Sequence, residues 1–98
     1  MKFEIEIKQE AREDIADIFL WYEKHQAHLG YLFLDKFEER ISFIQKDPQV
    51  YSKKYKEFRQ ALISKFPYLI IFEILENKVI VYAVIHGKRK PSLRFKRK

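Results

Sequence analysis

The 98-residue sequence contains no cysteine, which excludes a disulfide framework and a thiolate nucleophile. It has no apolar run approaching the roughly 20 residues that a membrane-spanning helix needs. Charged residues also interrupt the N-terminus, which therefore lacks the apolar core of a signal peptide: Glu4, Glu6, Lys8 and Glu10. There are no internal repeats and no linker between domains. We expect one cytoplasmic domain spanning residues 1–98, with one modest core and no membrane partner.

Acidic residues become scarce in the second half of the chain. Residues 1–51 contain 7 Lys or Arg against 11 Asp or Glu, whereas residues 52–98 contain 13 Lys or Arg against 3 acidic residues. The last eleven residues, 88–98, form a basic tail. Such asymmetry favours a basic face that meets a polyanionic partner. The alternative is a solvated charge pattern that only keeps the chain soluble.

Hydrophobic periodicity predicts a strand and two helices in the first half. Residues 2–8 alternate apolar and charged side chains, which is typical of a strand with one buried face. Helical spacing then follows at these positions: Ala11, Ile15, Ile18, Phe19 and Tyr22. A second helix has a similar apolar face and ends at Asp47-Pro48: Leu34, Phe37, Ile41 and Ile44. The short connection at His25–Gly30 predicts an antiparallel helical hairpin.

The second half favours strands. After a polar stretch, Gln49–Glu57, the candidate strands are Phe58–Ser64, Tyr68–Leu75 and Val79–Ile85. Glu76–Lys78 forms a hairpin loop, and the continuous apolar runs fit central strands covered on both faces. The order β-α-α-β-β-β predicts an α+β fold, in which a helical hairpin packs on a mainly antiparallel four-stranded sheet. This pattern leaves the position of the first strand in the sheet open.

Several short motifs occur in a specific order. They are Asp47-Pro48 with Tyr51, then Phe58-Arg59-Gln60-Ala61, Phe66-Pro67-Tyr68, and Val84-Ile85-His86-Gly87-Lys88-Arg89-Lys90-Pro91. In order and spacing the chain resembles the RelE/ParE superfamily of toxins from type II toxin-antitoxin systems, over nearly its whole length. The resemblance implies a toxin that an acidic antitoxin protein holds inactive, using an extended segment and a helix.

The resemblance leaves the target open. RelE-like members cleave mRNA on the ribosome, whereas ParE-like members inhibit DNA gyrase, and a shared fold does not select between them. We interpret the chain as a RelE-like, metal-independent endoribonuclease (an mRNA interferase). The alternatives are a ParE-like inhibitor of gyrase that is not a nuclease, and an inactive member that binds only its antitoxin.

Three residues are candidates for RNA cleavage, which requires proton transfer and stabilisation of a crowded phosphate. Arg89 follows the last strand and Arg59 lies on a neighbouring one, so we expect both to converge at one sheet edge, where guanidinium groups bind phosphate. The resemblance matches Arg89 to an arginine that contacts the scissile phosphate. His86 can transfer protons near neutral pH, or can instead cap backbone groups at the strand end.

Further basic or aromatic residues are candidates for nucleic-acid binding: Lys53, Lys54, Lys56, Lys65, Tyr68, Lys88, Lys90 and Arg94. The chain also departs from the RelE-like nucleases. Tyr68 stands at a position where one of those nucleases has a catalytic arginine. Those nucleases also have paired lysines on the second strand, whereas this chain has the small Ala61 there. In the basic tail, Leu93 and Phe95 either anchor the antitoxin or pack back on the helices. No histidine spacing indicates a metal, so we expect no metal site and no cofactor.

Overall fold

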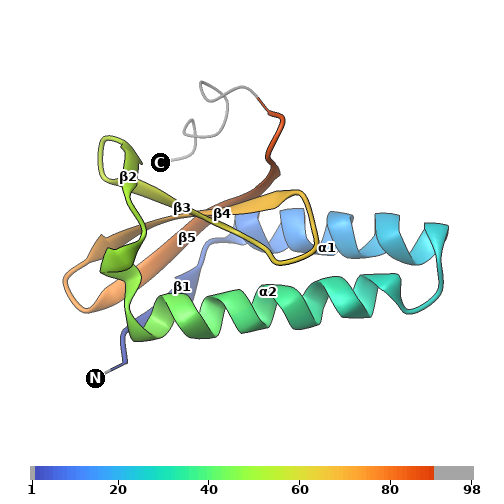
Figure 1. Cartoon of the computed structure of the whole chain (residues 1–98), viewed down its shortest axis with the longest axis horizontal. Coiled ribbons are helices and arrows are strands. Elements are labelled where there is room, and N and C mark those ends of the chain that lie inside the picture. Colours follow the sequence, from blue (N-terminus) through green and yellow to red (C-terminus); the bar gives the residue numbers. More distant parts are fainter. Residues whose placement is uncertain (1, 90–98) are drawn as a thin grey trace.

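Two helices cover one face of a five-stranded sheet (Figure 1). The computed structural model describes residues 2–89 of the chain. Its elements, including a 3-10 turn named η1, are β1 (Glu4–Ile7), α1 (Gln9–His25), α2 (Leu29–Lys46), η1 (Pro48–Val50), β2 (Lys53–Tyr55), β3 (Phe58–Leu62), β4 (Tyr68–Leu75) and β5 (Lys78–His86). The predicted α+β class and the helical hairpin on a mainly antiparallel sheet are confirmed.

The strand order in the sheet is β1-β5-β4-β3-β2. β1 pairs in parallel with β5, with Glu4 opposite Lys78, and all other pairs are antiparallel. This places the first strand, whose position the sequence left open, at one edge beside the last strand. β4 and β5 occupy the middle of the sheet, which is why their sequences are apolar on both faces.

The prediction of four strands is wrong by one, because β2 forms inside the stretch interpreted as a polar connection. All three residues of β2 are exposed, and the strand exists through its pairing with Arg59 and Phe58 of β3. A strand that buries no side chain has no hydrophobic alternation to reveal it. A short, lysine-rich strand of this kind is also a common way to end a sheet edge.

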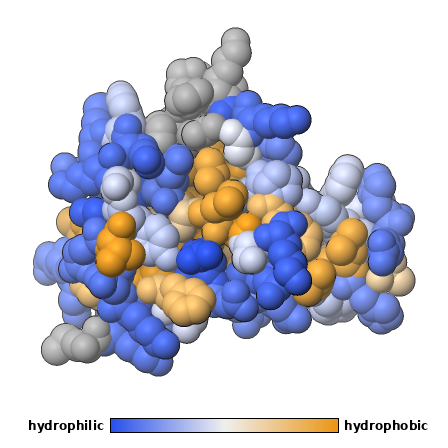
Figure 2. All heavy atoms as spheres, in the orientation of Figure 1, coloured by the Kyte–Doolittle hydropathy of each residue, from blue (hydrophilic) through white to orange (hydrophobic). Residues whose placement is uncertain are grey.

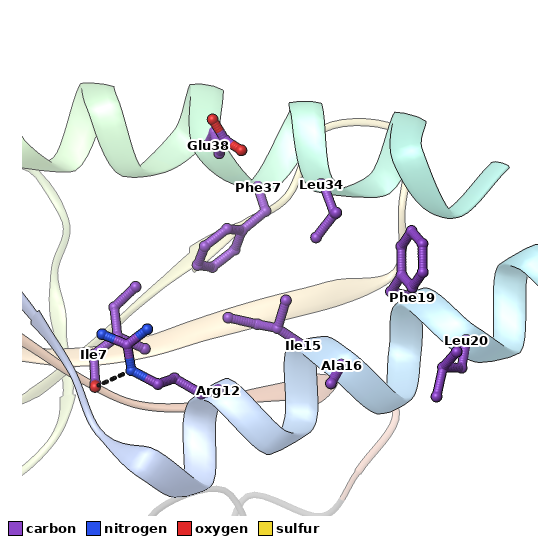
Figure 3. Close-up of a pocket in the computed structure, with 9 residues that line it drawn as sticks. All are labelled: Ile7, Arg12, Ile15, Ala16, Phe19, Leu20, Leu34, Phe37 and Glu38. Carbon is purple, nitrogen blue, oxygen red and sulfur yellow. Dashed lines mark hydrogen bonds between the residues drawn. The ribbon is translucent and has the colours of Figure 1, made fainter. Parts of the chain in front are cut away.

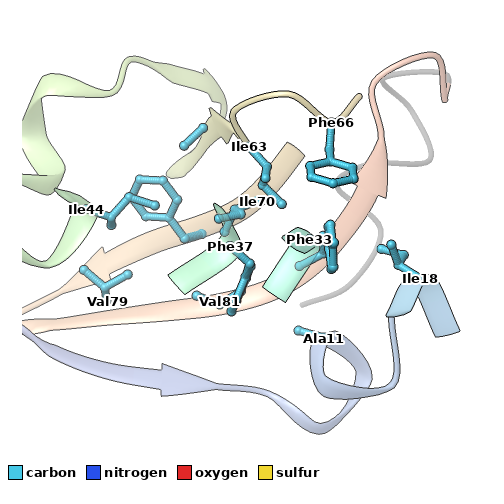
Figure 4. Packing of buried hydrophobic residues seen from close by; sticks show 13 residues of the cluster. Ala11, Ile18, Phe33, Phe37, Ile44, Ile63, Phe66, Ile70, Val79 and Val81 are labelled. Atoms are coloured by element: carbon cyan, nitrogen blue, oxygen red, sulfur yellow. The ribbon is translucent and has the colours of Figure 1, made fainter. Parts of the chain in front are cut away.

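The main core lies between the helices and the sheet (Figure 4). Its fully buried members come from both layers, and they include Ala11 of α1, Phe33 and Ile44 of α2, Ile70 of β4 and Val81 of β5. On the helices these residues follow the spacing of three and four that keeps side chains on one face. The predicted apolar stripes therefore do face the sheet.

The tip of the helical hairpin is held together by one carboxylate. Glu23 of α1 accepts hydrogen bonds from the backbone N–H groups of His28 (3.2 Å) and Gly30 (2.8 Å) at the start of α2. These are amide groups that a helix cannot satisfy from within its own first turn. Gly30 is buried, and a Cβ there would lie 2.6 Å from the carbonyl oxygen of Phe19. The two helices can approach this closely only because residue 30 has no side chain.

The opposite face of the sheet, which we call the helix-free face, has its own apolar cluster. Its members come from β3, β4 and β5: Phe58, Leu69, Ile71, Ile80, Tyr82, Ala83 and Ile85. On this face the Tyr82 hydroxyl donates a 2.6 Å hydrogen bond to Oε1 of Glu73, whose side chain is 6% exposed. Burial, followed by the bond to Glu73, raises the pKa of Tyr82 far above its ordinary value.

Candidate functional site

The end of β5 brings two of the predicted catalytic residues together. His86 is the last residue of β5, opposite Tyr68 of β4, and Arg89 follows in a tight turn in which its N–H bonds the carbonyl of His86. The Nδ1 atom of His86 accepts the backbone N–H of Lys88 at 3.0 Å, so the neutral ring carries its proton on Nε2. His86 therefore caps a backbone N–H group through Nδ1, and within residues 2–89 its Nε2 has no hydrogen-bond partner.

A line of aromatic rings connects this turn to the helices. The His86 and Tyr68 rings pack edge to face with centroids 5.3 Å apart, and the Tyr68 and Tyr22 rings are 6.3 Å apart. Burial raises the pKa of Tyr68, and burial together with the nearby Tyr68 raises the pKa of Tyr22. Both phenols consequently stay protonated at neutral pH and can donate a proton, but neither can serve as the general base of a nuclease.

Arg59 lies far from His86, contrary to the expected convergence. Arg59 is opposite Phe72 on β4, whereas His86 is opposite Tyr68. Four residues along a strand span about 13 Å, and β4 also separates the two strands that carry these side chains. Arg59 instead donates from Nη1 to the carbonyl oxygens of Tyr51 (2.6 Å) and Gln49 (3.4 Å). Its guanidinium fastens η1 to the sheet, so the three predicted catalytic residues do not form one site.

The candidate binding lysines are spread over the edge of the sheet near β2. Lys53 forms an ion pair with Glu57 at 3.0 Å, and the Lys56 ammonium lies 5.3 Å from the centre of the Tyr55 ring. Lys54 is exposed on the same strand, and the exposed Lys65 lies in the turn between β3 and β4. These cations face solvent and can meet an anionic partner. Lys88 is exposed beyond β5, and Lys90 and Arg94 lie outside the described residues.

An apolar groove runs between the two helices (Figure 3). It has a volume of about 580 Å³, and Ile15 and Phe19 of α1 face Leu34 and Phe37 of α2 across it. At one end the Arg12 side chain bonds the carbonyl oxygen of Ile7 at 3.2 Å. A long apolar trough between helices has the shape and chemistry to receive another amphipathic helix.

The sequence prediction missed this groove. Two of its lining residues, Ala16 and Leu20, are exposed and lie outside the helical stripe that faces the sheet. The available signal was the unbroken apolar run from Ile18 to Trp21, which is too wide for one helix face. Apolar surface is present elsewhere too, and Figure 2 shows apolar atoms near the middle of the view, bordered by hydrophilic ones. Several large apolar side chains are exposed: Leu20, Trp21, Tyr31, Leu32, Phe43, Val50, Tyr55, Leu62 and Leu75.

Across residues 2–89, no three His, Asp or Glu side chains come close enough to hold a metal ion. Neither α1 nor α2 is long and apolar enough to cross a membrane.

Comparison with known proteins gives a structural relative and a protein family for the chain. Among solved structures it is similar to a chain of the chromosomal ParDE TA system from P. aeruginosa, with a TM-score of 0.76 and 10% sequence identity. That similarity covers 87% of this chain and 96% of the other, and at this identity it shows a shared fold. A search of curated proteins gave no match. Residues 5–91 match the family model described as the ParE toxin of the type II toxin-antitoxin system parDE, so the chain belongs to the ParE toxin family.

Proposed function

We propose that this chain is the toxin of a type II toxin-antitoxin pair and that it acts by binding and inhibiting DNA gyrase. The observation that carries the proposal is the family match over residues 5–91, because the ParE-like branch of the superfamily is the one that acts on gyrase. Inhibition of this kind needs a binding surface and no catalytic centre. The exposed lysines of β2 and the β5 turn offer such a surface.

The arrangement of the candidate catalytic residues supports a toxin that binds its target over one that cuts RNA. A metal-free nuclease needs an acid, a base and a phosphate ligand around one reacting atom. Here the Arg59 guanidinium donates to two backbone carbonyls. His86 lies opposite the first residue of β4, four residues along that strand from the partner of Arg59, and Arg89 follows His86. The phenol beside His86 has a raised pKa and stays protonated.

Purified components test the target directly. The toxin is titrated into gyrase, ATP and relaxed plasmid, and supercoiling is measured; in parallel, mRNA on ribosomes is incubated with toxin and mapped by primer extension. We expect loss of supercoiling with unchanged mRNA ends. New mRNA ends with normal supercoiling would instead identify a RelE-like nuclease. No effect in either assay, together with normal growth on induction, would leave a member that binds only its antitoxin.

We further propose that the partner antitoxin is acidic and places an amphipathic helix in the groove between α1 and α2. The groove supplies the apolar contacts, and an acidic chain complements the net charge of +6 of the toxin. Ala16→Arg puts a long charged side chain into the groove from an exposed position. Ser42→Arg adds the same charge at an exposed position of α2 that does not line the groove.

Calorimetric titration of both variants with the purified cognate antitoxin tests the groove. We expect Ala16→Arg to weaken binding at least about tenfold, since a buried charge without a partner disrupts an apolar contact. Ser42→Arg should bind like the wild type. Equal affinities for the two variants would move the antitoxin site away from the groove.

A further inference from the structure

Arg40 of α2 joins three parts of the chain beside the end of β3. Its Nε donates to the carbonyl oxygen of Leu62 at the end of β3 (3.0 Å), and its Nη1 donates to the hydroxyl of Tyr51, the residue that follows η1 (3.1 Å). Tyr51 is fixed in turn, because its carbonyl oxygen accepts Nη1 of Arg59 at 2.6 Å and its ring packs edge to face with the buried Phe72. Bonds to two separate elements therefore hold the Arg40 guanidinium in place.

The third nitrogen of this guanidinium, Nη2, has no partner within residues 2–89. A guanidinium has five N–H donors, and in this part of the chain the nitrogens of Arg40 that meet an acceptor are Nε and Nη1. Solvent reaches Nη2, because the buried side-chain nitrogen and oxygen atoms without a partner among these residues are Arg59 Nε and Gln60 Oε1. No carboxylate of residues 2–89 forms an ion pair with Arg40. Arg40 is therefore a fixed cation with a pair of N–H donors open to a ligand.

Large apolar side chains are exposed on each element that Arg40 touches. On α2 the ring of Phe43 has its centre 5.6 Å from Cζ of Arg40 and is 50% exposed. Leu62 on β3 is 57% exposed, and Val50 on η1 is 67% exposed. Arginine and aromatic side chains are enriched in the hot spots of protein interfaces, and a side chain that is already held in place loses less entropy on binding. We call these residues, with Tyr51, the Arg40 surface.

The Arg40 surface lies on the other side of α2 from the groove that we propose for the antitoxin. Successive residues of a helix are rotated by about 100°, so Phe43, nine residues after Leu34 of the groove, points about 180° away from it. The surface continues instead into the exposed lysines of β2, because Tyr51 is two residues before Lys53. It therefore adjoins the cations proposed to meet the target, and a helix in the groove leaves it uncovered.

The chemistry of this surface favours an acidic protein segment over a nucleic acid. A carboxylate can pair with Nη2 of Arg40 while an apolar side chain next to it packs on the Phe43 ring. A nucleic-acid backbone carries a charge at every nucleotide and gains its affinity from several Lys or Arg contacts. The Arg40 surface has one open arginine beside three exposed apolar side chains, which suits a single carboxylate with apolar neighbours.

We propose that the Arg40 surface binds a segment of the toxin's target protein in which an Asp or Glu lies between apolar side chains. The carboxylate pairs with Arg40, and the apolar side chains pack on Phe43. This role rests on the proposed function, because it requires a toxin that acts by binding a protein. It adds which surface the toxin uses and which chemistry that surface recognises.

Phe43→Glu and Phe43→Gln test the surface as a matched pair. Both replacements remove the ring, and the two new side chains have similar helix propensities. Only glutamate places a carboxylate three residues from Arg40, where it can pair with the guanidinium and block it. Ser42→Glu adds a negative charge on nearly the opposite side of α2 from Arg40, since two residues correspond to about 200° of rotation. It therefore controls for the change in net charge.

Each variant is measured in three ways: the toxin concentration that halves supercoiling by gyrase, growth after induction, and antitoxin affinity by calorimetry. We expect Phe43→Gln to raise the half-inhibitory concentration by about three- to tenfold through loss of the ring. Phe43→Glu should raise it at least about tenfold further, because the charge-assisted hydrogen bond to the target is lost as well. Ser42→Glu should inhibit like the wild type. All three should bind the antitoxin like the wild type, which also shows that they are folded.

Equal inhibition by the two Phe43 variants, or an equal loss with Ser42→Glu, would overturn the Arg40 surface. A parallel loss of antitoxin affinity would overturn it too, by assigning the surface to the antitoxin. Growth separates the surface from the choice of target. If the wild type stops growth without affecting supercoiling, gyrase is the wrong target, and the same ranking of the variants in growth still supports the surface. A wild type without effect in either assay would overturn both.

The melting temperatures of the two Phe43 variants should agree within about 4 °C, because the side chain is half exposed.

Discussion

Replacing Gly30 with alanine should destabilise the protein, although the same change usually stabilises a helix. Alanine in place of glycine inside a helix contributes about 0.8–1.0 kcal/mol. Gly30 is the second residue of α2, so this gain is an upper limit at this position. The opposing effect is steric: the new Cβ would lie 2.6 Å from the Phe19 carbonyl oxygen, 2.7 Å from Cγ of Glu23 and 2.8 Å from Cδ1 of Phe19.

The steric effect is the larger one. The Phe19 carbonyl belongs to the backbone of α1, so relief requires the helices to separate. The Glu23 side chain cannot move away without lengthening its 2.8 Å bond to the N–H of Gly30. Overpacking of this kind costs roughly 1–3 kcal/mol, and loss of the hydrogen bond adds about 1 kcal/mol. We expect a net loss of about 1–3 kcal/mol, or a melting temperature lower by roughly 4–24 °C.

The other glycine of the chain is a natural control. Among residues 2–89, a Cβ at Gly87 would meet only the Pro67 carbonyl oxygen, at 3.5 Å, and the Gly87 backbone does not have a positive φ. Gly87→Ala should therefore leave stability unchanged or raise it by about 0.4–1 kcal/mol. Urea denaturation of both variants measures the difference. If Gly30→Ala is as stable as the wild type, the close packing of α1 and α2 does not require a glycine at residue 30.

Three further substitutions test individual contacts. Tyr82→Phe removes the hydroxyl bonded to the buried Glu73 and should cost about 1–3 kcal/mol in urea denaturation. Because the pKa of Tyr82 is raised by folding, its contribution is complete below the ordinary value of 10.0 and is lost as the pH rises above it; a wild-type stability that stays flat in strong alkali would contradict this. Arg59→Met should lower stability by about 1–3 kcal/mol, because two carbonyls at η1 lose their donor; a fully stable variant would show that this contact contributes nothing. His86→Asn keeps an acceptor for the Lys88 N–H but cannot act as an acid or base, so a gyrase inhibitor retains its toxicity on induction; loss of growth inhibition at equal protein level would favour catalysis.

Periodicity revealed the parts of the fold that bury side chains. Tyr68–Leu75 was predicted with the bounds that β4 has, and the helical stripe around Ile18 does face the core. β2 was not predicted, because Lys53, Lys54 and Tyr55 are all exposed. A strand held by backbone pairing alone leaves no hydrophobic pattern in the sequence.

The candidate site was harder to predict, since it depends on which strands become neighbours. His86 and Arg89 meet in one turn because they are close in sequence. Arg59 was expected beside them, but β4 lies between β3 and β5, and residue type does not reveal strand order. The groove between the helices likewise depends on how α1 and α2 pack, and a stripe pattern describes each helix by itself.

The parallel pairing of β1 with β5 has a consequence for when this toxin can form. The hydrogen bond between Lys78 and Glu6 joins residues that are 72 positions apart in the sequence. β5, which carries Lys78, pairs with β1 on one side and with β4 on the other. At about 5–20 residues per second, a ribosome needs roughly 4–14 s between these two positions. During that interval the first strand has no neighbour, and the face of the hairpin that will meet β5 has nothing to cover it. The sheet can therefore form only after the ribosome has synthesised β5.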